Sequence, residues 1–408
     1  MKSRRGSGIL AIMALVAVGI YSLSCKPAWS PDSGKVAYIG VSKVGEDADP
    51  LDALIDTIKG SADDKSDEQP EEKEDPRYSA AVYDLKTREC KAVFGETRDE
   101  SGLHMVPMEV FWPTRGNELV IVSSSADDSA VKGGLLVSAY DLRKNATRVL
   151  QHVSDATADI SQSLAPMILQ DKRWLWLHGG KKEDECFRMD LRKGRVTELG
   201  RDLMLFGTAK KVFFVKEAFD GGLVVGRMKT FWGLREKPLF TVSTQADDEL
   251  VPVLAVPSRC ERFACVRQRQ ETQTLEIYDG KGRNIGKIPV HESLDADEAL
   301  TGAEWSPDGT TLWLAVEGED ADGIQYAGLA EITVAEGATR IIKLDEGGVL
   351  GDLKPLQLSL SPDGAYLAVT MMGDESVRLC LVDLRDEGRP ITLAPEPVPA
   401  APQPADAK

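Results

Sequence analysis

One short pattern recurs along this chain and limits what it can fold into. An aromatic or apolar residue precedes a tight polar turn, and a short apolar strand follows; the pattern occurs seven times at irregular spacing. The clearest copies run over residues 29–38, 305–313 and 360–368, where the turn reads Ser-Pro-Asp followed by Ser or Gly. Repetition every 40–50 residues or so indicates a propeller or a solenoid, because each unit must bury its apolar face against a neighbour.

A second motif, an Asp followed by Leu and a basic residue, marks the third strand of several repeats. It occurs at Asp84, Asp141, Asp190 and Asp383, with the variant Asp-Gly-Lys at Asp279. Its separation from the anchor of the first strand is 22 residues in one repeat and 23 in two others. Two marks at nearly constant separation favour a unit of four short strands.

Seven residues serve as anchors of the first strands. They are Trp29, Trp112, Ile168, Leu205, Val256, Trp305 and Leu360. The turns after the third, fourth and fifth anchors are degenerate, so six or eight units stay open. The sequence predicts an all-β fold, a β-propeller of seven four-stranded blades over residues 26–393.

The residue types of the repeated turn have a physical reason. Serine caps the following amides, proline presets φ near −65°, aspartate tolerates the third position, and glycine takes a left-handed conformation. We expect the aromatic residue before the turn to pack between neighbouring blades. The predicted structural residues are Trp29, Pro31, Asp32, Trp112, Trp305, Pro307, Asp308, Gly309, Pro362, Asp363 and Gly364.

Charge and composition set two segments apart from the propeller. Residues 46–75 carry 13 acidic and 3 basic side chains, within a chain of formal net charge −17. Such a composition cannot bury enough apolar surface to order itself, so we expect a disordered acidic insertion over 46–76. The proline- and alanine-rich residues 394–408 predict a disordered tail. Nucleic acid is excluded as a partner, since no concentrated basic face is evident.

Residues 1–25 are typical of an export signal. Lys2, Arg4 and Arg5 precede an uncharged apolar run over 8–20, which is too short for a comfortable membrane span. Residues 21–25 resemble a bacterial lipoprotein signal, which implies lipidation of Cys25, although Ser22 stands where that pattern prefers leucine. An ordinary cleaved signal is the alternative. An acyl chain on Cys25 would leave only three residues, about 10 Å, before Trp29.

The turn Trp-Ser-Pro-Asp-Gly with its following strand resembles the TolB-type propeller repeat, a relative of the WD repeat. The match is strong at residues 29–38, 305–313 and 360–368, partial at Trp112, and weak between them. The resemblance implies a propeller of the bacterial cell envelope that binds other proteins at one mouth of the ring. Fold analogy alone does not fix a function.

The sequence patterns of catalytic and metal-binding sites are missing or incomplete in this chain. The sequence holds no Gly-x-Ser-x-Gly elbow for a serine peptidase, and its four histidines lie in no triad context. Acidic residues at 295–298 and 319–323 lack the spacing of a calcium loop. Five cysteines besides Cys25 are expected as small apolar residues, with a Cys260–Cys265 disulfide as the alternative. We expect no catalytic residue, metal or cofactor.

One aromatic pair, Phe231 and Trp232, lies in an extension of the fourth repeat and is our candidate partner contact, with packing on its own blade as the alternative. The sequence thus predicts a monomeric, non-catalytic scaffold of the cell envelope. Its partner would be an envelope protein or a cell-wall component, and a lipid on Cys25 would hold it at a membrane. The alternative is an enzyme, a hydrolase or lyase, with an unrecognised site in the central channel.

Overall fold

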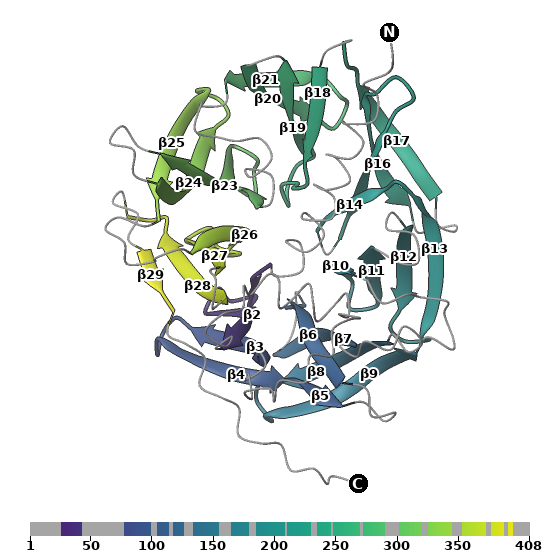
Figure 1. Cartoon of the computed structure of the whole chain (residues 1–408), viewed down its shortest axis with the longest axis vertical. Helices are drawn as coiled ribbons and strands as arrows, with labels where there is room; N and C mark the ends of the chain where they lie inside the picture. Colours follow the sequence, from purple (N-terminus) through teal and green to yellow (C-terminus); the bar gives the residue numbers. More distant parts are fainter. Residues whose placement is uncertain are drawn as a thin grey trace, which may run out of the picture. The chain divides into compact units, whose positions relative to one another are not determined.

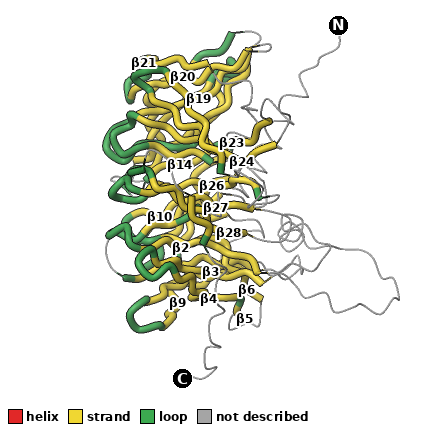
Figure 2. Tube along the Cα trace, turned by 90° about the vertical axis from the view of Figure 1, so that its left-hand side faces the viewer, coloured by secondary structure: helices red, strands yellow, loops and turns green. Residues whose placement is uncertain are grey.

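A computed structural model describes sixteen segments of the chain. They are residues 26–42, 77–98, 104–113, 117–125, 134–154, 165–178, 185–208, 210–229, 235–245, 248–269, 272–289, 302–319, 325–344, 353–372, 377–386 and 391–394. Within these segments the regular structure is entirely strand, and no helix occurs (Figure 2). None of the described residues, therefore, forms a helix of the length and apolar character needed to cross a bilayer.

The described residues group into two compact units, and the division falls within strands β13 and β26. Unit one covers the described parts of 199–350 together with residues 355–358; unit two covers those of 26–198 and the remainder of the C-terminal region.

Unit one contains three antiparallel sheets of four strands, each in simple sequence order (Figure 1). The first sheet consists of β14 (Met204–Gly207), β15 (Val212–Glu217), β16 (Leu223–Lys229) and β17 (Arg235–Val242). The second consists of β18 (Asp248–Val253), β19 (Arg262–Arg269), β20 (Thr272–Asp279) and β21 (Asn284–Pro289). The third consists of β22 (Ala303–Trp305), β23 (Thr311–Glu319), β24 (Gln325–Thr333) and β25 (Ala338–Lys343).

Unit two repeats the same meander. One sheet holds β10 (Ala165–Gln170), β11 (Trp174–His178), β12 (Glu185–Asp190) and β13 (Arg195–Arg201). Another holds β5 (Thr97–Arg98), β6 (His104–Phe111), β7 (Glu118–Ser125), β8 (Gly134–Asp141) and β9 (Ala146–Ser154).

The remaining sheet has eight strands and joins the first and the last strands of the described residues. It holds one meander of β1 (Ala28–Trp29), β2 (Lys35–Ser42), β3 (Arg77–Asp84) and β4 (Glu89–Gly95), and a second of β26 (Lys354–Leu360), β27 (Tyr366–Met372), β28 (Val377–Asp383) and β29 (Ile391–Leu393). A single bridge from Val41 to Val377 connects β2 to β28. The all-β propeller class is confirmed; the count of seven blades stays a prediction.

The three clear copies of the repeated turn have one hydrogen-bond pattern. Within each turn the serine hydroxyl donates to the aspartate carboxylate, over 2.7, 2.8 and 2.6 Å at Asp32, Asp308 and Asp363. Each carboxylate accepts the amide two residues later, at 3.1 Å in every copy. Each serine hydroxyl also accepts the amide five residues later, at 2.8–2.9 Å. The turn is thus closed by its own side chains, which is why these residue types are required.

These hydrogen bonds favour the ionised carboxylates. The Ser306 hydroxyl and the Thr310 amide lower the pKa of Asp308, and the Ser30 hydroxyl and Gly34 amide do the same for Asp32. Burial alone would raise the pKa of Asp363, but its hydrogen-bond donors outweigh it, so this pKa is also lowered.

The second motif has a similar explanation. Its aspartate ends the third strand and accepts the amide two residues later, at 2.9–3.0 Å at Asp84, Asp141, Asp190, Asp279 and Asp383. The leucine amide next to it bonds to a carbonyl at the start of the second strand, as from Leu85 to Gly34 and from Leu384 to Ala365. The motif therefore fixes where the third strand ends.

Both faces of the sheets are buried where neighbouring sheets of a unit meet. In unit one, the face of Phe206, Phe213 and Val215 packs on Phe263 and Tyr278 of the next sheet. Trp305 belongs to the core between the second and third sheets, and in unit two Trp29 belongs to the core between the meanders β1–β4 and β26–β29. Trp112 lies just beyond β6, half-buried against the core of the β1–β4 and β6–β8 strands.

Residues 170–173 depart in sequence from the repeated turn but still form a tight turn between β10 and β11. Asp171 and Lys172 have φ of 52° and 53°, and the Arg173 amide donates to the Gln170 carbonyl. The alternative of a Cys260–Cys265 disulfide is wrong, since both cysteines are free. They lie on either side of the start of β19, and Cys265 points into the core.

A pair of glycines in equivalent turn positions gives a test of this geometry. Gly309 and Gly364 have φ of 74° and 75°. A Cβ on Gly309 would lie 2.8 Å from both Cys260 Sγ and Arg262 Cδ, whereas a Cβ on Gly364 would meet nothing within 4 Å. We expect Gly364→Ala to lower the free energy of unfolding by about 1 kcal/mol and Gly309→Ala by about 2–3 kcal/mol. Urea unfolding of both variants measures the difference, and equal losses would contradict the packing described.

Candidate functional site

A cluster of charged side chains crosses the second sheet of unit one. Arg267, on β19, donates from Nη1 to Asp248 Oδ2 on β18 over 2.6 Å and from Nη2 to Glu276 Oε2 on β20 over 2.9 Å. Lys287, on β21, lies 2.9 Å from Glu276 Oε1. The strand register brings them together. Lys287 stands opposite Glu276, and Asp248 and Glu276 each lie two positions along the strand from the residue that stands opposite Arg267. We call Asp248, Arg267, Glu276, Tyr278 and Lys287 the Arg267 cluster.

The buried members of the cluster are paired on several sides. The side chains of Asp248 and Glu276 expose 4% and 3% of their surface, and that of Arg267 exposes 18%. Glu276 also accepts a hydrogen bond from the Tyr278 hydroxyl at 2.5 Å. The Arg267 guanidinium donates in addition to the carbonyl of Ser243 at 3.1 Å. This pairing offsets the cost of taking the charges out of water.

The pairing sets the protonation states. Burial alone would raise the pKa of Glu276, but hydrogen bonds from Arg267, Tyr278 and Lys287 lower it to about 2. Burial and the neighbouring Glu276 carboxylate raise the pKa of the Tyr278 hydroxyl to about 12, and the same two causes raise the pKa of the Cys265 thiol to about 12. The cluster therefore contains neither a carboxylate of moderate basicity that could accept a proton nor a reactive thiolate. We interpret it as a network of ion pairs that stabilises the sheet.

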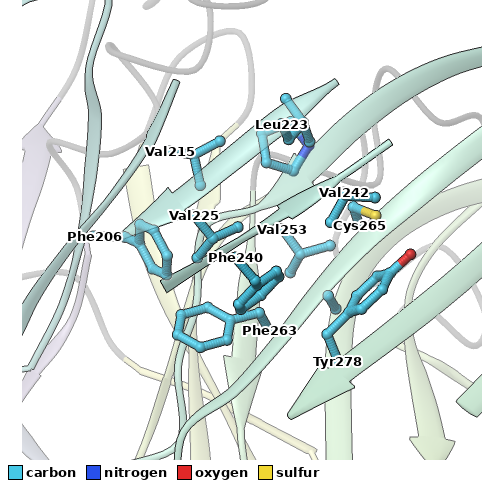
Figure 3. Close-up of a pocket in the computed structure, with 12 residues that line it drawn as sticks. Phe206, Val215, Leu223, Val225, Phe240, Val242, Val253, Phe263, Cys265 and Tyr278 are labelled. Atoms are coloured by element: carbon cyan, nitrogen blue, oxygen red, sulfur yellow. The ribbon is translucent and has the colours of Figure 1, made fainter. Parts of the chain in front are cut away.

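An apolar pocket adjoins the cluster between the first two sheets of unit one (Figure 3). Phe206, Phe240 and Phe263 line it together with valines of both sheets, and Cys265 and Tyr278 give it its polar atoms. Its rings meet edge-on, with centroids 6.0 Å apart for Phe206 and Phe263 and 5.5 Å apart for Phe240 and Phe263. With a volume of about 10 Å³, it has room for about one water molecule. We interpret it as a packing gap between sheets.

A second buried carboxyl group lies in unit two. Glu109, on β6, exposes 2% of its surface, follows a bulge between Pro107 and Glu109, and has one oxygen, Oε2, with no hydrogen-bond partner. Burial raises the pKa of Glu109 well above its usual value, against the opposing effects of the Val110 amide and of Lys26. A carboxyl group that keeps its proton in a buried position is a typical candidate for acid–base chemistry.

Sequence reasoning missed both sites. Arg267, Glu276 and Tyr278 fall on alternating strand positions that place them on one face, but their pairing depends on a register that spacing does not reveal. Glu109 interrupts an otherwise apolar strand, His-Met-Val-Pro-Met-Glu-Val-Phe, and that interruption was the available signal.

Several predicted sites lie outside the described residues. They include Cys25, Phe231, Trp232, the acidic insertion, the tail beyond Ala394 and most of both acidic segments weighed for calcium. Within the described parts of the chain, no group of three or more His, Cys, Asp or Glu side chains is arranged to hold a metal ion.

Comparison with known proteins gives a likeness of fold. No protein-family model matches the chain, and no curated protein matches it. Solved structures similar to it include an oligogalacturonate lyase from Vibrio parahaemolyticus (10% identity, 90% of each chain covered, TM-score 0.48). The β-propeller domain of the Trilobed protease from Pyrococcus furiosus is similar as well (13% identity, 91% of this chain and 97% of that one, TM-score 0.49). Acylaminoacyl peptidase from Pyrococcus horikoshii is a third (11% identity, 88% and 50%, TM-score 0.48). Identities this low say nothing about activity.

The Arg267 cluster predicts a specific dependence of stability on pH. The pKa of Glu276 is about 2 in the folded protein, against an ordinary value of 4.5, so its contribution is fully present above pH 4.5 and is lost as pH falls toward 2. We expect Glu276→Gln to lower the free energy of unfolding by about 3 kcal/mol at neutral pH and by much less near pH 2. Chemical denaturation across this range measures it. Glu261→Gln is the control, because its partly exposed ion pair with Lys211 should contribute at most about 1 kcal/mol; equal losses for both variants would contradict the assignment.

Glu109 predicts the opposite pH dependence. Its pKa is raised in the folded protein, so the unfolded chain loses this proton first, and the wild-type protein loses stability as pH rises from 4.5 toward the folded pKa. Glu109→Gln lacks this titration, so we expect the free energy of unfolding of the variant, relative to wild type, to increase as pH rises above about 4.5. Urea unfolding at several pH values measures the difference, with the exposed Glu217→Gln as control. Parallel curves for wild type and Glu109→Gln would contradict the prediction.

Proposed function

We propose that this protein is a non-catalytic, TolB-like β-propeller of the bacterial cell envelope that binds an envelope protein or a cell-wall component. The observation that carries the proposal is that the aspartates of both repeated motifs form hydrogen bonds within their own turns. Asp32, Asp308 and Asp363 accept amides of their own turns, and the aspartates of the second motif do the same. The residues that recur in the sequence thus build a scaffold.

Two further features support a binding role. The ion pairs of the Arg267 cluster connect the four strands of one sheet, which gives a rigid support for loops that carry a binding surface. The predicted export signal and the lipoprotein-like residues 21–25 support an envelope location, with a lipid on Cys25 as the membrane anchor. The expectation of a monomer belongs to the same proposal.

A second candidate function is an enzyme, and Glu109 is the observation that favours it. A buried carboxyl group with a raised pKa and an unpartnered oxygen could donate a proton to a leaving group, as a hydrolase or lyase requires. Glu109 lies on β6, and an enzyme with an unrecognised site is the alternative that the sequence left open.

One set of variants separates the two functions. Full-length protein, a form lacking residues 46–76 and Glu109→Gln are each used as bait against an envelope fraction and assayed for turnover of its polysaccharides and peptides. A scaffold predicts retained capture by Glu109→Gln and no turnover by the wild type. Turnover that Glu109→Gln abolishes would establish the enzyme and overturn the scaffold. Loss of capture with the 46–76 deletion would assign the partner to the insertion.

The membrane anchor has its own test. We expect Cys25→Ala to move the protein from the membrane to the soluble envelope fraction, because Cys25 is the residue that would carry the proposed lipid anchor. Fractionation followed by immunodetection measures the shift. Membrane retention that does not change would overturn the lipid, whatever the outcome for binding.

A further inference from the structure

The turn between β15 and β16 holds a phenylalanine at its tip in a fixed backbone. The Ala218 amide bonds to the Gly222 carbonyl at 2.7 Å, and the Gly221 amide bonds back to Ala218 at 2.9 Å. Asp220 caps the Gly222 amide at 3.2 Å. Gly221 has φ of 81°, a conformation that favours glycine. Phe219 lies between these anchored positions.

The turn is also fixed to the neighbouring strand. The hydroxyl of Thr244, just after β17, donates to the Asp220 carbonyl at 3.1 Å. A Cβ on Gly222 would lie 2.5 Å from the Val242 carbonyl oxygen, so the backbone approaches this strand as closely as glycine allows. The tip therefore has few conformations to lose when something binds to it.

Phe219 is exposed to an unusual degree. It exposes 111% of its reference surface; the other large hydrophobic residues that stand out in the described part of the chain, Val149 and Ile285, expose 62% and 42%. A phenylalanine in water forgoes about 2 kcal/mol that burial would provide. A rigid turn that presents such a side chain resembles the preorganised aromatic anchors of protein interfaces.

The charges around Phe219 are acidic. Glu217 and Asp220 flank it and are exposed. The nearest cation in the sequence, Lys216, is engaged by Glu236 over 2.5 Å and lies over the ring of Phe214. An apolar side chain between two carboxylates fits an apolar cavity with a basic rim, and it would be repelled by an anionic bilayer.

We propose that the tip 217–220 is a docking site in which Phe219 inserts into an apolar pocket, rimmed by Lys or Arg, on a partner protein. The inference rests on the proposed binding function and names the contact that this function would use. It does not replace the candidate contact at Phe231 and Trp232, which lie outside the described residues.

Photo-crosslinking locates the partner. Phe219→p-benzoylphenylalanine keeps an aromatic side chain at the tip, and Ile285→p-benzoylphenylalanine is the matched control in the same unit. Irradiation in the intact envelope should join position 219, and not position 285, to one protein. Crosslinking only to lipid, only to a second copy of this chain, or equally at both positions would overturn the proposal.

The partner protein that crosslinking identifies is then purified, and its binding to this protein tests the contact. We expect Phe219→Ser to raise Kd at least tenfold and Phe219→Trp to raise it less than about threefold, since truncation of a central aromatic anchor typically costs this much. Glu217→Lys should raise Kd about threefold and weaken its dependence on salt. An unchanged Kd for Phe219→Ser would overturn the docking site while leaving the scaffold function intact. If the wild-type protein binds no envelope protein at all, both fall together.

Discussion

A carboxylate that accepts the amides of its own turn is the interaction on which this structure most depends. In the repeated turns, Asp32, Asp308 and Asp363 each take a serine hydroxyl and a backbone amide, and the aspartates that end the third strands take the amide two residues on. Each bond is local, so it forms without long-range contacts and fixes where one strand ends and the next begins. Short strands bury their apolar faces against a neighbouring sheet only when each strand begins and ends at the right residue. The turns determine these end points.

The turns also connect neighbouring sheets. In unit one, three successive carbonyls of the turn at Pro307, Asp308 and Gly309 receive hydrogen bonds from Arg259, Cys260 and Arg262 of the preceding sheet. In unit two, the Asp363 amide donates to the Ser33 hydroxyl at 3.2 Å, and the Trp29 indole donates to the Ser359 carbonyl at 2.8 Å. Ser33 occupies the position that glycine holds in the other two copies and keeps a positive φ of 58°. Its hydroxyl, which glycine lacks, accepts a hydrogen bond that joins two turns 330 residues apart.

The sequence allowed the strand-and-turn architecture to be predicted because its determinants are local. Serine, proline, aspartate and glycine at fixed spacing define a turn regardless of the rest of the chain, and all three clear copies follow the expected pattern. The segment at 170–173, whose sequence departs from the repeated turn, still forms a tight turn, because Asp171 and Lys172 adopt the left-handed conformation. The candidate sites were not predictable in this way. The Arg267 cluster depends on four strands pairing in one register, and the exposure of Phe219 depends on how its turn sits against Thr244.

The two buried carboxyl groups show how one residue type takes different roles in one fold. Glu276 faces an arginine, a lysine and a tyrosine hydroxyl, so it stays ionised and contributes stability. Glu109 interacts with Lys26 and accepts the amide of Val110. Burial has the larger effect on the pKa of Glu109, so this carboxyl group retains its proton. Apolar packing alone does not account for Glu109, since a leucine or methionine would pack more favourably on such a strand. Lys26 stands directly after the proposed lipid-bearing Cys25, and its backbone bonds to Glu109. A structural role for Glu109 follows from this position: it holds Lys26 against β6, so that an anchor on Cys25 would act directly on the folded propeller.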